Sequence, residues 1–201
     1  MRYTMFNTPV IKSFLRGISL ILLKILGWKA TGELPKEVKY IIIVAPHTSN
    51  WDLLYGIILA FALKLDAPRY IAKKELFRGL FSPLMKWSGA IPIDRSLSHH
   101  IVEQMVSKFK ESEKFVLGLA PEGTRHRKDY WKSGFYHIAL NAHVPILLAF
   151  IDYASKTGGA GPLIYPTGDM EQDMSIIRNF YLTVKGKHPE NTSPVVIYSK
   201  S

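Results

Sequence analysis

The chain has 201 residues, 47% of them hydrophobic, so it is long enough for one substantial core and is expected to form a single globular domain. Lysine and arginine number 26 against 16 aspartate and glutamate residues, and the formal net charge of +10 indicates anionic partners: nucleic acid, lipid headgroups, coenzyme A or an acidic carrier protein. The absence of cysteine excludes disulfides, a thiolate nucleophile and cysteine-ligated metal sites.

The N-terminal segment, residues 9–28, is mostly apolar and is interrupted by Lys12, Arg16 and Lys24. On a helix these cations fall within about 120° of one another, which leaves one basic side and an apolar remainder. Three charges disfavour a membrane-spanning helix, and no small-residue cleavage site of a signal peptide follows. The pattern favours a helix lying in a membrane interface. The alternative is a helix packed on the domain with its cations in water. We expect an interfacial helix over residues 1–30 and an α/β domain over residues 31–201.

Beyond this helix, apolar runs alternate with helical patterns. Residues 31–36 and the glycine-rich residues 156–162 predict turns, and Pro92 favours an edge position or a bulge for its strand. Residues 76–87 fit a second interfacial element, the wall of an acyl-chain pocket or a kinked core helix. The predicted strands are residues 40–44, 69–72, 89–95, 115–120 and 144–151, and the predicted helices are residues 53–65, 98–113, 133–143 and 174–185. The alternation predicts an α/β fold, a largely parallel sheet flanked by helices.

An imidazole and a carboxylate follow the first predicted strand. On a continuous helix the spacing of His47 and Asp52 would separate them by about 140°. With His47 in the turn, Ser49 as N-cap and Asp52 in the first helical turn, the carboxylate can reach the ring. Such a pair fixes the imidazole tautomer and leaves a base near neutral pH. The alternative is a capping box of Ser49 and Asp52 that serves only the helix start.

Two further strand ends carry charge: Asp94 and Arg95 follow the strand at 89–95, and residues 122–125 follow the strand at 115–120. In a parallel sheet these ends meet at one edge, so the three loops are expected to share one cleft. Arg95 and Arg125 offer guanidinium forks suited to a phosphate, although each alone fits a solvated or salt-bridged role. Gly123 would let the backbone approach a ligand and present its N–H.

Together these segments resemble the four sequence blocks of the glycerolipid acyltransferases, the family of the lysophosphatidic acid (1-acylglycerol-3-phosphate) acyltransferases. The resemblance covers about residues 40 to 155, and its first and third blocks together are highly specific. The blocks are His47 with Asp52, residues 89–95, residues 121–125 and residues 144–146.

The resemblance implies transfer of an acyl group from acyl-CoA or acyl carrier protein to the hydroxyl of a lysolipid, with no acyl-enzyme step, no metal and no other cofactor. His47 would be the general base and Asp52 would orient its ring. The block that holds the acceptor's phosphate would comprise Arg95, Glu122, Gly123, Thr124 and Arg125. The expected place is peripheral or monotopic, at the cytoplasmic face of a membrane with an anionic surface.

Several residues depart from the family's pattern: Pro46 stands where Asn is frequent, Pro92 where a larger residue is usual, and Leu148-Ala149 where a second proline is frequent. They leave the acceptor open, and a lyso-aminolipid is an alternative to 1-acylglycerol-3-phosphate. A basic lipid-binding module without catalysis is a second alternative. Nucleic acid is not expected as a partner, because the cations are interleaved with apolar segments and no recognition motif is present.

Overall fold

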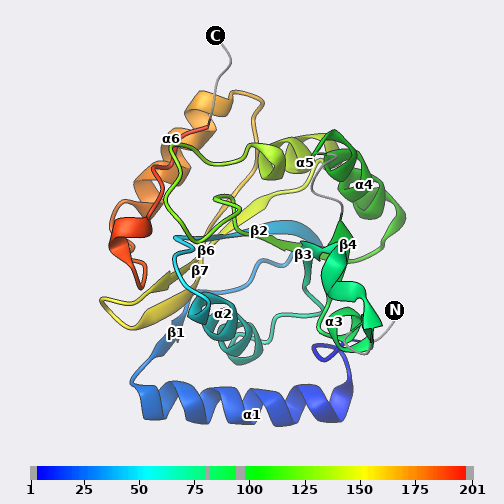
Figure 1. Ribbon diagram of the computed structural model, residues 1–201, viewed down its shortest axis with the longest axis vertical. Coiled ribbons are helices and arrows are strands. Elements are labelled where there is room, and N and C mark those ends of the chain that lie inside the picture. The colour runs from blue at the N-terminus through cyan, green and yellow to red at the C-terminus, as the bar shows by residue number, and fades with distance from the viewer. Residues whose placement is uncertain (1–3, 80–81, 94–97, 198–201) are drawn as a thin grey trace.

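The computed structural model describes residues 4–79, 82–93 and 98–197. Within these residues a seven-stranded sheet forms the centre of the molecule, in the order β1-β7-β6-β2-β5-β3-β4 (Figure 1). The strands are β1 (Lys29–Thr31), β2 (Lys39–Ala45), β3 (Arg69–Lys73), β4 (Ala90–Ile93), β5 (Phe115–Leu119), β6 (Ile146–Asp152) and β7 (Thr157–Ile164).

Five neighbouring strands, β6, β2, β5, β3 and β4, run parallel, so their carboxyl ends lie along one edge of the sheet. β7 pairs with β6 in antiparallel fashion and β1 pairs with β7 in parallel. The predicted α/β class and largely parallel sheet are confirmed, and β4, which contains Pro92, is the edge strand that the proline favoured.

Helices cover both faces of the sheet (Figure 1). Side chains of β2 alternate between them: Ile41 and Ile43 pack with Met105 and Phe109 of α4, whereas Ile42 packs in the cluster on the opposite face, the side of α2. α1 packs on α2, where Leu23 joins Ile58 and Leu59 in one buried cluster. The helices are α1 (Pro9–Leu26), α2 (Trp51–Ala62), α3 (Ser82–Trp87), α4 (Ser98–Glu111), α5 (Gly134–Ala142) and α6 (Met170–Tyr181), with short 3₁₀ turns at Lys74–Phe77 and Pro189–Asn191.

Two strands differ from the sequence prediction. Residues 156–162 were predicted as a flexible turn, but they lie largely in β7, and β1 was not predicted. Glycines are needed in β7 for packing: a Cβ at Gly159 would lie 1.9 Å from the carbonyl oxygen of Thr31, and a Cβ at Gly161 would lie 2.3 Å from the ring of Phe180. The glycines therefore admit close neighbours inside the sheet. Asp94 and Arg95 lie outside the described residues.

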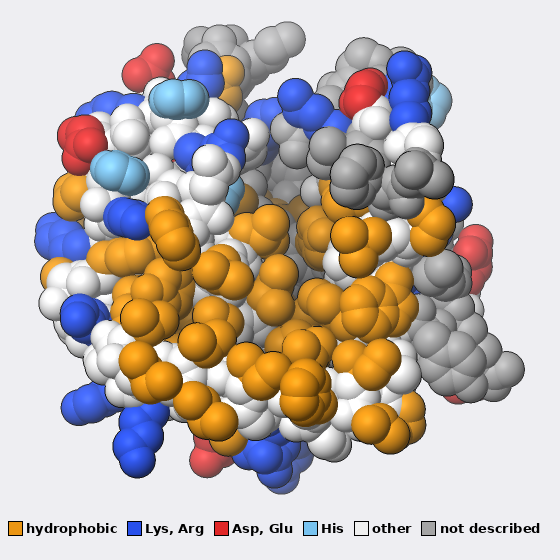
Figure 2. Space-filling view, turned by 60° about the horizontal axis from the view of Figure 1, so that its bottom comes forward, with side chains coloured by type: hydrophobic (Ala, Val, Ile, Leu, Met, Phe, Trp, Pro, Cys, Tyr) orange, Lys and Arg blue, Asp and Glu red, His pale blue; other side chains and the backbone are white. Residues whose placement is uncertain are grey.

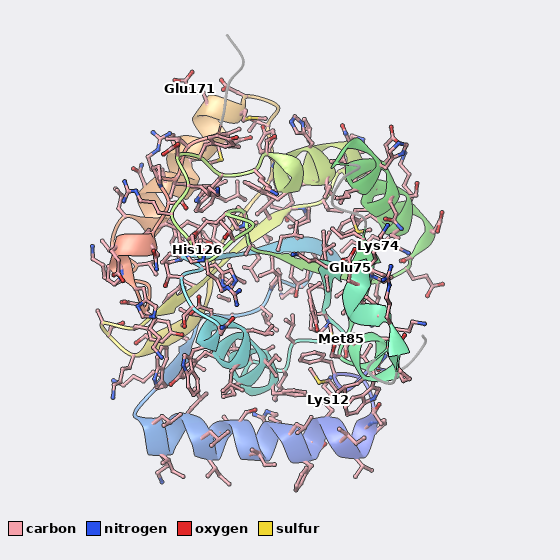
Figure 3. All side chains as sticks on the ribbon, viewed as in Figure 1. Lys12, Lys74, Glu75, Met85, His126 and Glu171 are labelled. Carbon is pink, nitrogen blue, oxygen red and sulfur yellow. The ribbon has the colours of Figure 1, made fainter. Side chains whose placement is uncertain are left out.

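The outer side of α1 is apolar. Val10, Phe14, Ile21 and Ile25 are each more than half exposed and form one stripe, which we call the outer apolar face. Figure 2 shows the apolar side chains gathered on this side of the molecule. Lys12 lies on the side of α1 that faces the rest of the molecule (Figure 3), where it pairs with Asp66 at 3.1 Å. In the part of the chain that is described, no helix is both long and apolar enough to span a membrane.

Candidate active site

His47 and Asp52 meet at the carboxyl end of β2. The chain leaves the strand through a cis Ala45–Pro46 peptide bond, turns through His47 to Asn50, and enters α2 at Trp51. His47 Nδ1 lies 3.0 Å from Asp52 Oδ2. The predicted pairing is confirmed, with the ring in the turn and the carboxylate in the first turn of the helix.

Asp52 also organises the turn itself. Its Oδ2 accepts the backbone N–H groups of Thr48 and Ser49, each at 2.8 Å. Asp52 thus serves the helix start and also contacts the ring, so the alternative that it serves only the helix start is wrong. The N-cap is Asn50 rather than Ser49, whose Oγ accepts the N–H of Trp51 at 3.2 Å.

Asp52 is 4% exposed, yet its carboxylate is held in the charged form. Burial alone would raise the pKa of Asp52, but hydrogen bonds from His47, from the hydroxyl of Tyr153 and from two backbone N–H groups outweigh it and lower the pKa. A charged Asp52 requires the proton of the neutral imidazole on Nδ1, so Nε2 carries the lone pair. The His47 side chain is 25% exposed and lines a cavity, which makes that nitrogen available as a base.

Glu122 supports His47 from the turn after β5. Its side chain is buried, and Oε1 accepts the backbone N–H of His47 at 2.8 Å, while the Ser193 hydroxyl lies 3.5 Å from Oε2. Burial raises the pKa of Glu122 to about 7, and the hydrogen bond from the His47 N–H only partly opposes this. Glu122 thus ties the turn after β5 to the turn after β2.

Gly123, Thr124 and Arg125 line the same cavity as His47 and Asp52. Gly123 takes a left-handed conformation (φ +67°), where a side chain would press on Lys132. Its N–H donates to the carbonyl of Ala120 at 3.0 Å, so it is not presented to a ligand as the sequence suggested. The structure brings together every predicted site residue that it describes; Arg95 lies outside the described residues.

Sequence reasoning missed two side chains near this site. Lys73 ends β3 and lines the cavity, and Tyr153 follows β6 and donates its hydroxyl to Asp52 Oδ1 at 2.7 Å. The available signal was topological, because both residues stand at carboxyl ends of predicted parallel strands, as His47 does.

The cavity has a volume of about 1160 Å³ and is lined by both polar and apolar side chains. The polar lining residues include His47, Asp52 and Arg125. The apolar lining comes from α2 and the sheet and includes Ile57, Leu59, Ala60, Ile42 and Leu147. Among the residues that the structure describes, no group of three or more histidine, aspartate or glutamate side chains is placed to hold a metal ion.

Comparisons with known proteins agree with this architecture. The sequence model of the family described as Acyltransferase matches residues 29–151. The 1-acyl-sn-glycerol-3-phosphate acyltransferase of Streptococcus pneumoniae (strain ATCC BAA-255 / R6) is 34% identical over 141 residues, which are 67% of this chain and 52% of that protein. The chain therefore spans about half the length of this curated relative.

A solved structure shares the fold. The crystal structure of the 1-acyl-sn-glycerophosphate (LPA) acyltransferase, PlsC, from Thermotoga maritima matches with a TM-score of 0.57 at 16% sequence identity, over 85% of this chain and 78% of that one.

Proposed function

This chain belongs to the acyltransferase family, and from that membership we propose that it transfers a fatty acyl group from an acyl thioester to the hydroxyl of a lysophospholipid. The proposed acceptor is 1-acylglycerol-3-phosphate, the product phosphatidic acid, and the donor acyl-CoA or acyl carrier protein. The relative from Streptococcus pneumoniae is a 1-acyl-sn-glycerol-3-phosphate acyltransferase, which supports the choice.

One observation carries the proposal: an oriented His47–Asp52 pair and the guanidinium group of Arg125 line the same cavity. A lipid-binding module without catalysis would need the cation, and its turn could use the carboxylate of Asp52, but it would not need an oriented imidazole in the cavity. The pair is arranged to remove a proton, and the cation to hold an anionic group of the molecule that carries it.

In the proposed reaction, Nε2 of His47 accepts the proton of the acceptor's hydroxyl as that oxygen attacks the thioester carbonyl carbon. The carbonyl becomes a tetrahedral oxyanion, a C–O bond forms, and the C–S bond then breaks. The leaving thiolate takes the proton from the imidazolium, so atoms and charge balance without a covalent enzyme intermediate. Asp52 stabilises the imidazolium between these steps.

The turn after β5 is proposed to hold the acceptor's phosphate. Arg125 would form charge-assisted hydrogen bonds to it, Thr124 would add a hydroxyl, and Gly123 would allow the sharp turn that places both. Glu122 would shape the loop through its bond to the His47 N–H. Arg95 is assigned to the same phosphate by the family resemblance alone.

The proposed place of action is a membrane surface at its cytoplasmic face, with residues 1–30 as the interfacial part and residues 31–201 as the acyltransferase domain. The outer apolar face of α1 supports this, as do the exposed side chains of Trp51, Leu53 and Leu54 on α2. Leu53 also lines the cavity, so this apolar surface continues to the site. We propose that a lipid acceptor enters along this surface of α2.

Replacement of His47 by Ala tests the chemistry. Thiol release from acyl-CoA in the presence of 1-acylglycerol-3-phosphate is expected to fall by about 10²-fold or more, the usual contribution of a general base. His100→Ala, on the exposed face of α4, is the matched control and should retain turnover. Undiminished turnover of His47→Ala would show that the base is assigned wrongly.

The identity of the acceptor and of the donor needs a second measurement. A panel of lysolipids, including 1-acylglycerol-3-phosphate and a lyso-aminolipid, would be assayed with acyl-CoA and with acyl carrier protein. We expect the highest kcat/KM for the phosphate-bearing acceptor. Lipid binding without turnover of any acceptor would favour the non-catalytic module.

A further inference from the structure

Tyr153 stands where β6 ends, beside the turn that holds His47. β6 runs parallel to β2 and is its direct neighbour, so the first residue after β6 lies near the N-terminal end of α2. The Tyr153 hydroxyl donates to Asp52 Oδ1 at 2.7 Å. This contact spans 101 positions of the chain.

We propose that Tyr153 is a positioning residue for the acyl transfer, which holds the Asp52 carboxylate in the one rotation that directs Oδ2 at the His47 ring. The inference rests on the proposed function for its catalytic meaning. Its structural half, the orientation of the pair, can be tested without any substrate.

The division of donors between the two oxygens carries the argument. Oδ2 faces His47 Nδ1 and accepts the N–H groups of Thr48 and Ser49, whereas Oδ1 accepts the Tyr153 hydroxyl. Rotation of the carboxylate about its Cβ–Cγ bond would move Oδ2 away from the ring. Because Tyr153 holds the opposite oxygen, such a rotation breaks a short hydrogen bond to a charged acceptor.

Tyr153 is itself held from three sides. Its backbone N–H donates to the carbonyl of Lys185 at 2.9 Å. Its ring contacts the rings of Trp28 and Tyr55, with centroid distances of 5.1 Å and 5.6 Å. In both pairs the ring planes are near perpendicular. Trp28 after α1, Tyr55 in α2 and Lys185 after α6 therefore hold the residue, and with it the position of its hydroxyl.

The phenol also keeps its proton. Burial, followed by the hydrogen bond to Asp52 and the charge of that carboxylate, raises the pKa of Tyr153 above its ordinary range. It is thus a donor at every pH at which the protein is expected to act. A serine or a water molecule in its place would lack this fixed direction.

Tyr153→Phe removes the hydroxyl and keeps the ring contacts. We expect kcat to fall about 10- to 100-fold with the acceptor KM unchanged, since about that range corresponds to one lost hydrogen bond to a charged group. Tyr55→Phe is the control, because it removes a hydroxyl from the same aromatic group and retains the ring; its kcat should stay at the level of the unsubstituted protein. Thermal unfolding of both variants establishes that they fold.

The second readout is the proton NMR signal of the His47 Nδ1–H, observed without substrate and assigned by its loss in His47→Gln. We expect it to be displaced or broadened by exchange in Tyr153→Phe and unchanged in Tyr55→Phe. Incorporation of 4-aminophenylalanine at position 153 restores a donor and should restore most of kcat.

The outcomes separate the two proposals. An unchanged Nδ1–H signal, or an unchanged kcat, in Tyr153→Phe would overturn the positioning role. If the signal is displaced in Tyr153→Phe but the unsubstituted protein turns over no acceptor, the orienting contact is supported and the proposed function is overturned instead.

Discussion

Glu122 is the residue whose environment most changes its chemistry. Burial raises its pKa to about 7 from an ordinary 4.5, so the folded state binds the proton more tightly than the unfolded state. Its contribution to stability is complete below pH 4.5 and is lost as the pH rises through about 7.

Glu122→Gln should therefore be stabilising only at high pH. The amide oxygen can still accept the His47 N–H, and no buried charge has to form. We expect a gain in the free energy of unfolding on the order of 2 kcal/mol at pH 8, and little difference at pH 5. Urea unfolding at the two pH values measures it, with the exposed Glu103→Gln as control. An equal difference at both pH values would contradict the raised pKa.

Arg125 is proposed to hold the acceptor's phosphate, so its loss should act on the acceptor. In Arg125→Ala we expect the acceptor KM to rise about 10- to 100-fold, with the donor KM unchanged, because one charge-assisted hydrogen bond contributes about 1.5–3 kcal/mol. Steady-state kinetics with each substrate varied in turn measures this.

The matched control is Arg127→Ala, two residues along the same loop, whose guanidinium lies 3.4 Å from the carbonyl of Thr192. Arg127 should be dispensable for the acceptor KM. A change confined to the donor KM in Arg125→Ala would reassign Arg125 to the thioester's carrier.

At the site, the local pairing and the shared edge of the strand ends could be predicted, whereas specific hydrogen bonds between distant residues could not. The pairing of His47 with Asp52 follows from a strand, a turn and a helix start within five positions. Tyr153 donates to the same carboxylate from 101 positions away, and a tyrosine after a strand carries no signal of such a partner. The strand order, which the sequence does not specify, decides which chain segments lie beside the turn.

Among the elements, β7 shows what a glycine-rich strand requires. Gly159 pairs with Thr31 of β1, and its missing Cβ is what admits the Thr31 carbonyl. We expect Gly159→Ala to lower the free energy of unfolding by about 3 kcal/mol or more, since the clash is with backbone that cannot rotate away.

Gly17→Ala provides the comparison, because a Cβ there meets nothing within 4 Å and α1 is helical. That substitution should raise stability by about 0.5–1 kcal/mol. Urea unfolding distinguishes the two, and a tolerated Gly159→Ala would mean that β1 is not packed against β7 in solution.

Strands that are buried on both faces could be predicted from their apolar runs, whereas strands shaped by close backbone packing could not. β2 and β6 read as apolar runs because both faces of the sheet are covered. β7 contains the run Gly158-Gly159-Ala160-Gly161, which is typical of a turn, because its neighbours approach too closely for side chains. β1 has three residues and only β7 as its neighbour, so it leaves no pattern to detect.

At the scale of the whole molecule, two forces could bring the protein to a membrane: the net charge of +10 and the outer apolar face of α1. They are separable, because salt screens exposed charges over about 10 Å and leaves apolar burial intact. Each fully inserted apolar side chain contributes about 1.5–3 kcal/mol, against about 1 kcal/mol for a basic residue near an anionic surface, so the loss of two apolar side chains should cost more binding free energy than the addition of two negative charges.

Phe14→Glu combined with Ile21→Glu should therefore lower binding to phosphatidylcholine vesicles by about 100-fold or more, whether or not phosphatidylglycerol is included. Both side chains are exposed, so the fold should persist. Gln104→Glu combined with Gln172→Glu adds the same negative charge to exposed positions on α4 and α6, across the sheet, and should weaken only the binding to anionic vesicles, and only slightly. Cosedimentation of each double variant with each type of vesicle, at low and at high salt, measures these losses. Equal loss in both pairs of substitutions would mean that charge, rather than the apolar face of α1, holds the protein at the membrane.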